Sequence, residues 1–349
     1  LQLENGLLLL LKAPRGTFKK LEGEKVEVEV LEEIIKEVKP LPPYTTDSLL
    51  VDASTALRLS SAEVMRLAQE LFESGLITYH RTDSTTVSGV GMNIARQYLE
   101  RMGMDDYIVL RSWDGKEGAH ECIRPTRPLD SRELELMVRG RLIHVPIPLG
   151  RRHIELYDMI FRRFIASQMR PVKVRQLRVK FRLAGIEVER IFNVEVLEHG
   201  FDLFKPIRLV KADVRSGSYE IIEGKAKLVG EQPLYVESTL IRMMKDKNIG
   251  RPSTYAVTLE KLKRRYYIYR VRTGQLIATK LGQLVYRFLT ENYYELVSED
   301  RTRKLLEEMD KIERGEKELM VAIDELYKEL MNLLGAESYG LLLNSNVIS

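Results

Sequence analysis

The apolar residues of this chain follow strand-like and helix-like patterns in turn, and the order of these patterns limits the folds open to it. Residues 25–31 alternate valine with charged residues, which indicates a half-buried strand. After a proline-rich hinge the period becomes helical, strand-like alternation returns after Pro171, and from Val236 the pattern is helical again. Two separated β segments of like character can pair into one domain, with the first helical block inserted between them. We therefore predict an α+β protein of several domains and not a βαβ repeat.

Capping residues in the first helical block predict where its helices begin and end. Ser60 and Glu63 have the spacing of a capping box, and Gly75 is placed to end the helix that they begin. A second helix is expected over residues 88–102, and Asp130 is expected to cap a third. The segment that directly follows Gly75 is therefore expected to begin where this helix ends.

That segment, residues 75–84, places a tyrosine, a histidine, an arginine and a carboxylate close together. A phenol is a poor nucleophile in water because its pKa lies near ~10. If the segment is extended, Tyr79 and Arg81 point to the same side, which suits a phenol attacking a phosphodiester held by a guanidinium. The alternative is a packing residue, because the chain has 16 tyrosines and most tyrosines pack with a wet hydroxyl.

A second motif lies at residues 118–126 and contains His120 and Arg124. His120 could polarise a phosphate oxygen or relay a proton, and Arg124 could clamp a phosphate. An ordinary turn with a locally hydrogen-bonded histidine is the alternative. Glu121 is not expected to bind a metal, because too few His and Cys residues stand near it to complete a site.

A third motif at residues 249–256 predicts a loop that opens a helix. The backbone N–H groups of such a helix start, with Arg251 and the hydroxyls of Ser253 and Thr254, would make an anion pocket. An ordinary Ser/Thr cap on a structural helix is the alternative.

Basic residues, among them Lys263 and Arg264, crowd residues 261–272 around three tyrosines. Cations beside aromatic rings can hold a phosphate backbone and stack bases. A solvated helix end followed by an amphipathic strand explains the pattern equally well. The net charge of +4 does not by itself indicate a polyanionic partner.

Length and composition set outer bounds on the protein. A chain of 349 residues allows two or three domains, and its single cysteine, Cys122, excludes an intrachain disulfide framework and a multi-cysteine zinc module. We expect Cys122 to be a small buried residue. The high share of charged residues suits a thermophile. No signal peptide or membrane-spanning run is visible, so the expected compartment is the cytoplasm, and the start at Leu1 suggests an excised or processed piece.

Taken together and in this order, the motifs resemble those of the type IA DNA topoisomerases. The matching stretches are residues 42–46, 77–84, 119–125, 250–256 and 279–282. The resemblance covers about residues 20–335. The histidine after the tyrosine and the Gly-Ala-His form of the second motif look most like the topoisomerase part of reverse gyrase.

The resemblance implies a mechanism in which Tyr79 attacks one DNA strand and stays joined to its 5′ phosphate. A second strand then passes through the gap and the break is resealed. Arg81 matches the arginine that holds the scissile phosphate, and His120 matches a histidine that assists there. The residues expected to contact DNA are Thr78, His80, Asp83, Arg124, Arg251, Ser253, Thr254, Lys263 and Arg264.

The resemblance also implies a division of the chain within a toroid. The expected parts are a first half of a β arch at 1–44, a helical lid with the tyrosine at 45–170, the second half of the arch at 171–235, a helical DNA-binding base at 236–335 and a tail at 336–349.

One departure from the family pattern limits what this chain is expected to do alone. It contains no Asp-x-Asp pair and no Gly-rich Walker loop. The acidic toprim domain that holds Mg²⁺, and the helicase-like module that uses ATP, are therefore expected on another polypeptide or domain. We expect an excised fragment or the small subunit of a split enzyme, which alone binds single-stranded DNA weakly and cleaves poorly.

Three functions stay open at this point. The first is the tyrosine-carrying portion of a reverse gyrase, which in complete form adds positive supercoils using ATP. The second is a portion of a relaxing type IA enzyme that needs no ATP. The third is a catalytically silent clamp on single-stranded DNA.

Overall fold

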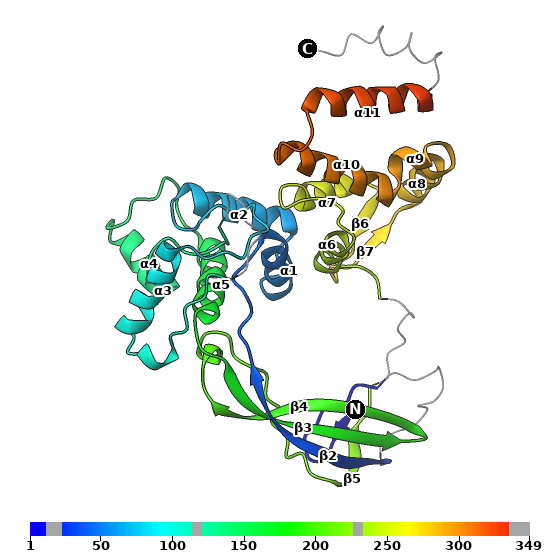
Figure 1. Cartoon of the computed structure of the whole chain (residues 1–349). Coiled ribbons are helices and arrows are strands. Elements are labelled where there is room, and N and C mark those ends of the chain that lie inside the picture. The colour runs from blue at the N-terminus through cyan, green and yellow to red at the C-terminus, as the bar shows by residue number, and fades with distance from the viewer. Residues whose placement is uncertain (12–22, 114–120, 226–232, 335–349) are drawn as a thin grey trace. The chain divides into compact units, whose positions relative to one another are not determined.

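The computed structural model describes residues 1–11, 23–113, 121–225 and 233–334. They form two compact units, one made of Leu1–Ile241 with Arg270–Ile277, the other of Arg242–Tyr269 with the described residues from Ala278 onward. Helices and an antiparallel sheet are both present, so the predicted α+β class is confirmed (Figure 1). Across the described ranges, no helix has the length and apolar character needed to span a membrane.

The first unit contains a five-stranded sheet in the order β1-β5-β2-β3-β4, and all its neighbours are antiparallel. Its strands are β1 (Gln2–Leu3), β2 (Lys25–Val38), β3 (Val172–Leu183), β4 (Ile186–Glu198) and β5 (Gly217–Glu223). The two β segments that the sequence separates by more than a hundred residues therefore do pair, since β2 lies beside β3 along almost its whole length.

Alternation over residues 25–30 of β2 and 177–183 of β3 gives this part of the sheet one apolar and one charged face. Val26 and Val28 of β2 and Val179 and Phe181 of β3 are buried in the same core. The intervening residues are glutamates on β2 and β4 and cations on β3, and they form ion pairs across the strands. Side chains that alternate along a strand point to opposite faces, so the sequence pattern alone fixes this division.

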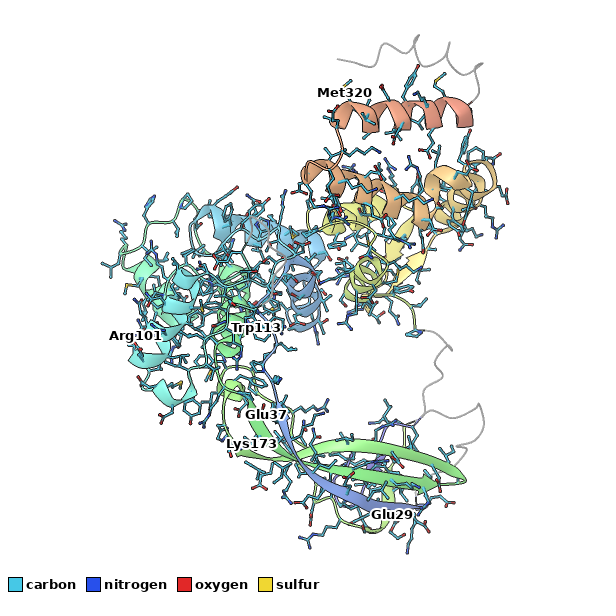
Figure 2. The ribbon with its side chains drawn as sticks, viewed as in Figure 1. Glu29, Glu37, Arg101, Trp113, Lys173 and Met320 are labelled. Atoms are coloured by element: carbon cyan, nitrogen blue, oxygen red, sulfur yellow. The ribbon has the colours of Figure 1, made fainter. Side chains whose placement is uncertain are left out.

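The first helical block is inserted between β2 and β3. Val38, the last residue of β2, is the register partner of Val172, the first residue of β3. Figure 2 labels Glu37 and Lys173, the next register pair, at this end of the sheet. Both ends of the block are therefore attached to neighbouring strands. The helices between them are α1 (Thr46–Ala56), α2 (Ser61–Glu73), α3 (Gly89–Arg101), α4 (Ser131–Arg139) and α5 (Arg151–Ser167), with a 3-10 turn η1 (Asp105–Tyr107).

The predicted caps set the helix limits. The Ser60 side chain accepts a hydrogen bond from Glu63 N at the start of α2, and Asp130 begins α4 with a full capping box. Gly75, with φ of 65°, follows α2 in the left-handed region where a side chain would be strained. The segment that carries Tyr79 thus begins directly after the end of α2.

The rest of the chain is mainly helical, as its pattern predicts. Its elements are η2 (Phe201–Leu203), α6 (Glu237–Asp246), α7 (Tyr255–Arg264), β6 (Ile268–Arg270), β7 (Leu276–Ala278), α8 (Lys280–Asn292), α9 (Tyr294–Val297), α10 (Glu299–Glu313) and α11 (Leu319–Leu334). Gly315, whose φ is 71°, lies between the end of α10 and the start of α11. The finer division into arch, lid and base stays a prediction.

The motif at residues 279–282 has a structural reason. Thr279 caps α8 by accepting from Gly282 N, and its hydroxyl donates to Tyr266 O at 2.6 Å. A Cβ on Gly282 would lie 2.1 Å from the backbone oxygen of Tyr267. Only glycine allows the start of α8 to approach the end of α7 this closely.

Candidate active site at Tyr79

Three sequence motifs meet in the helical block and are joined through their backbones. Ile123 N donates to Tyr44 O at 2.8 Å, and Thr78 N donates to Arg124 O at 2.9 Å. Thr46 N donates to the carbonyl oxygen of Thr82 at 2.8 Å. The segment around Tyr79 therefore lies between residues 42–46 and the second motif, which flank it in space as well as in sequence.

Side chains in the Tyr79 segment alternate between outside and inside, although the segment belongs to no strand. The exposed residues are Tyr79, Arg81 and Asp83, and the buried ones are His80, Thr82 and Ser84. Tyr79 and Arg81 therefore point outward together, as the spacing of two residues predicts. Their catalytic roles stay a prediction.

Thr46 holds this arrangement in place from the first turn of α1. Its hydroxyl lies 2.7 Å from His80 O and 3.0 Å from Thr82 O, and it accepts from Thr82 N at 2.9 Å. Thr46 is 1% exposed, so these bonds are shielded from competing water. The backbone on both sides of Arg81 is thus fixed, and the guanidinium must project outward.

The Tyr79 ring is held by aromatic neighbours while part of it stays exposed. Phe72 of α2 lies edge-on with its ring centroid 5.3 Å away, and the His80 ring lies 5.6 Å away. Tyr79 retains 37% of its surface. Contacts of this kind orient a ring without covering its polar end.

His80 is fully buried beside Tyr79 and lacks hydrogen-bond partners. Its exposed fraction is 0%, and neither ring nitrogen has a partner among the described residues. Burial lowers the pKa of His80 to about 4, and the positive charge of Arg81 acts in the same direction. His80 is therefore neutral near pH 7. Its predicted contact with DNA, and that of Thr78, whose hydroxyl donates inward to Cys122 O at 2.6 Å, stay predictions that this geometry does not support.

Arg81 is exposed and forms no ion pair within the part of the chain that the structure describes. Asp83, two residues further on, is also exposed. An exposed guanidinium beside an exposed phenol provides a cation and a nucleophile on one side of a fixed backbone.

Arg124 occupies a different environment from the one its motif suggests. It is 5% exposed and forms a bidentate pair with Glu121, from Nε to Oε1 at 2.7 Å and from Nη2 to Oε2 at 2.8 Å. Glu121 also accepts from Ser88 N at the start of α3, at 2.8 Å. Burial alone would raise the pKa of Glu121, but the bonds from Arg124 and Ser88 outweigh it and lower the pKa. The guanidinium of Arg124 is thus committed to the protein, and its predicted contact with DNA stays a prediction.

The remaining second-motif residues divide into two cases. His120 lies outside the described residues. Cys122 is fully buried, and burial raises the pKa of its thiol to about 12, which confirms the expected small buried residue. No group of three or more His, Cys, Asp or Glu side chains that could hold a metal is found among the described residues.

The third motif lies in the second unit and is already hydrogen-bonded. Arg251 Nη2 pairs with Asp310 of α10 at 2.7 Å. Thr254 Oγ1 accepts from Arg251 N at 2.8 Å, and Thr254 N donates to Arg251 O at the same distance. Ser253 is exposed. The predicted anion pocket is therefore partly filled by contacts within the chain.

The basic end of α7 is only partly neutralised. Lys263 pairs with Glu260 at 3.1 Å, whereas Arg264 is exposed. Both residues stay candidates for DNA contact. Sequence reasoning did not assign roles to Thr46 or Phe72, because their partners lie in other segments.

Comparisons with known proteins cover most of the chain. A family model described as DNA topoisomerase matches residues 12–323. The chain is 46% identical over 310 residues to reverse gyrase 1 of Aquifex aeolicus, covering 88% of this chain and 26% of that protein. It is 42% identical over 330 residues to the reverse gyrase of Pyrobaculum aerophilum, with 93% and 26% covered.

A solved structure shares the fold. The full-length topoisomerase I of Thermotoga maritima matches with a TM-score of 0.71 and 27% identity, over 89% of this chain and 53% of that one. The type IA topoisomerase fold predicted from the motifs is therefore confirmed. The chain spans about a quarter of the length of the curated relatives that it matches.

Proposed function

Because this chain belongs to the type IA DNA topoisomerase family and is similar to the topoisomerase portion of reverse gyrases, we propose that it supplies the nucleophile for DNA strand cleavage in such an enzyme. The observation that carries the proposal is the shared outward side of Tyr79 and Arg81 on a backbone fixed by Thr46.

The proposed reaction is a transesterification at one phosphodiester. The Tyr79 phenol oxygen forms a bond to phosphorus, and the bond from phosphorus to the 3′ oxygen breaks. The phenol loses its proton, and the 3′ oxygen leaves as a hydroxyl after taking up a proton. Resealing reverses these steps, and it needs no outside energy source because the phosphotyrosine retains the bond energy.

Arg81 is the proposed stabiliser of the charge that develops on the phosphate. Phosphoryl transfer asks a protein mainly for positioning and charge stabilisation. Arg81 suits this role because no carboxylate in the described part of the chain forms an ion pair with it. His120 is proposed to assist at the same phosphate.

The bound strand is proposed to continue over the second unit, along Arg251, Ser253, Thr254, Lys263 and Arg264. For Arg251 this requires its guanidinium to share or leave Asp310. Asp83 is a further proposed contact, since it is exposed beside Arg81.

The whole enzyme is proposed to need parts beyond this chain. The described residues do not fit a metal site, so Mg²⁺ is assigned to a toprim domain and ATP to a helicase-like module on a partner polypeptide or domain. With these parts the proposed activity is ATP-dependent positive supercoiling in the cytoplasm. The match to a topoisomerase I keeps a relaxing enzyme without ATP as a second candidate, and a helicase-like module beside this chain would decide between them.

The decisive experiment traps the covalent intermediate. The assembled enzyme is incubated with a single-stranded oligonucleotide labelled at its 3′ end, because the fragment that keeps the 5′ phosphate stays on the tyrosine, and denaturant is then added. We expect labelled protein from the wild type and none from Tyr79→Phe. The control Tyr286→Phe removes a hydroxyl from another exposed tyrosine and should leave the adduct intact.

Two results would contradict the proposal. An adduct that survives Tyr79→Phe would assign the chemistry to another residue. The absence of any adduct in the wild-type assembly, while DNA still binds, would favour the silent clamp.

A further inference from the structure

A second basic site lies in the first unit, where the end of the basic run 261–272 meets the end of α1. A hollow of about 580 Å³ is lined by Arg58, which follows α1, and by Arg270 and Arg272 of the β6–β7 hairpin. The beginning of α6 supplies Glu237 and Ser238 to the same wall. Three segments that are distant in sequence thus surround one space.

The arginines of this hollow have no ion-pair partner among the described residues. All three, Arg58, Arg270 and Arg272, are exposed. Glu237 is the one carboxylate among the lining residues, and it is 4% exposed. Its Oε2 accepts from Ser61 N at 2.8 Å, at the positive N-terminal end of α2. This bond holds the carboxylate at the helix end, and the three arginines form no ion pair with it.

Backbone contacts fix the walls of the hollow. The bond from Ser61 N to Glu237 joins α2 to α6, and Leu276 N donates to Tyr235 O at 2.7 Å, which joins the hairpin to the chain before α6. At the hairpin tip, Gly274 has φ of 88° and donates from its N to Val271 O at 2.8 Å. A site on fixed elements loses little entropy when an anion binds.

Arg58 is held in an unusual backbone conformation. Its φ is 56°, in the left-handed region that residues with a Cβ rarely adopt. The adjacent Leu59 is 2% exposed, so the chain must turn sharply between an exposed arginine and a buried leucine. Strain of this kind is a reason to look for a function at the residue that carries it.

We propose that this hollow, the arginine hollow, binds backbone phosphates of a DNA strand independently of base sequence. Three cations that form no ion pair with any described residue are suited to phosphate oxygens. The lining residues include no aromatic ring on which a base could stack. The proposal rests on the proposed function for the class of ligand, but none of its residues belongs to the Tyr79 site or to the third motif.

The test measures how the binding of a fluorescent oligothymidylate to the 349-residue chain depends on salt. The variant combines Arg58→Gln, Arg270→Gln and Arg272→Gln. The control combines Arg96→Gln, Arg132→Gln and Arg208→Gln, three exposed arginines outside the hollow, and so removes the same charge. We expect the slope of log K against log salt to fall in magnitude by about 2 in the hollow variant, at about 0.7 per lost contact. The control should keep the wild-type slope.

A lysine variant and a check of folding complete the test. Replacing the same three residues by lysine should restore the slope, and thermal melting followed by circular dichroism checks that all variants fold. Equal slopes in the hollow variant and the control would overturn the arginine hollow alone. A wild type that binds no DNA would overturn the proposed function with it. ATP binding is measured on the same variants. If the wild type binds ATP and the hollow variant does not, while the DNA slope is unchanged, the hollow is a free nucleotide site and the proposal is overturned.

Discussion

Strand β3 and the Tyr79 segment both alternate inward and outward side chains, but they treat outward charge in opposite ways. On β3, Arg182 lies 2.9 Å from Glu29 of β2 and 2.8 Å from Glu187 of β4. In the Tyr79 segment, Arg81 points outward with no ion pair among the described residues. Alternation decides which side a residue points to, and neighbouring strands decide whether its charge is used within the protein.

The physical cause of the difference is the presence of cross-strand partners. β3 is flanked on both sides, and its register places Arg182 opposite Glu27 on one strand and Glu187 on the other. The Tyr79 segment is fixed by isolated bonds, such as those from Thr46, and not by flanking strands with acidic side chains. Its arginine therefore has no acidic cross-strand partner among the described residues.

The largest effect is expected from Arg81→Ala. If Arg81 stabilises charge in the transition state, its loss should slow adduct formation by about 10²–10³-fold. The dissociation constant for the oligonucleotide should change far less, because one exposed cation contributes little to binding a long strand. Single-turnover trapping and fluorescence titration measure the two quantities. A weaker affinity with an unchanged cleavage rate would assign Arg81 to binding instead.

His80→Met tests the inner side of the same segment. The pKa of His80 is about 4 in the folded chain against an ordinary value of 6.5, so between these pH values the unfolded chain binds a proton that the folded chain does not. The free energy of unfolding should therefore fall as the pH decreases from 6.5 toward 4, by roughly 2–3 kcal/mol. Methionine has no titrating group and fits beside Phe72 and Tyr79, so the variant should lose less stability on acidification.

Urea unfolding at pH 7 and at pH 4.5 measures this difference. His144→Gln is the control, because His144 is exposed and its replacement should preserve the acid sensitivity. Equal acid sensitivity in the wild type and in His80→Met would show that the buried imidazole does not limit stability at low pH.

Thr46→Val tests the bonds that hold the segment. Valine has nearly the same shape but cannot accept from Thr82 N or donate to the carbonyl oxygens of His80 and Thr82. The loss should cost about 1–3 kcal/mol of unfolding free energy, because buried polar groups are left without partners. Adduct formation should also slow, since Arg81 is less well positioned.

The control for this variant is Thr290→Val on α8. Thr290 is half-buried, and its hydroxyl donates to Tyr286 O of its own helix at 2.8 Å through a bond that is exposed to solvent. Urea unfolding should detect little change there. A Thr46→Val variant as stable and as active as the wild type would show that the backbone around Arg81 is held by other contacts.

Local patterns predicted much of this molecule. The pairing of β2 with β3, the cap at Asp130 and the outward pair of Tyr79 and Arg81 all follow from alternation, capping chemistry and spacing. These features depend on neighbours a few residues apart or on periods that extend over a whole strand.

Features that depend on distant partners were not predicted. Arg251 was assigned to an anion pocket, and its ion pair with Asp310 involves a residue on another helix. The DNA contact assigned to His80 stays a prediction, but nothing in the sequence indicated that its imidazole is buried or that Thr46 bonds to its carbonyl oxygen. Arg124 pairs with Glu121, which lies only three residues earlier. This ion pair could have been predicted from the sequence, but Arg124 was interpreted as a phosphate clamp instead.

The smallest effect is expected from Arg182→Ala, which completes the comparison with Arg81. Arg182 has acidic partners on both sides, but it is an exposed side chain, and exposed ion pairs contribute little because water and salt screen them. Adduct formation should be unchanged, and the urea midpoint should shift by an amount close to the error of measurement. A large loss of cleavage with Arg182→Ala would mean that the sheet takes part in the reaction, and the distinction between charge used inside the protein and charge offered to DNA would fail.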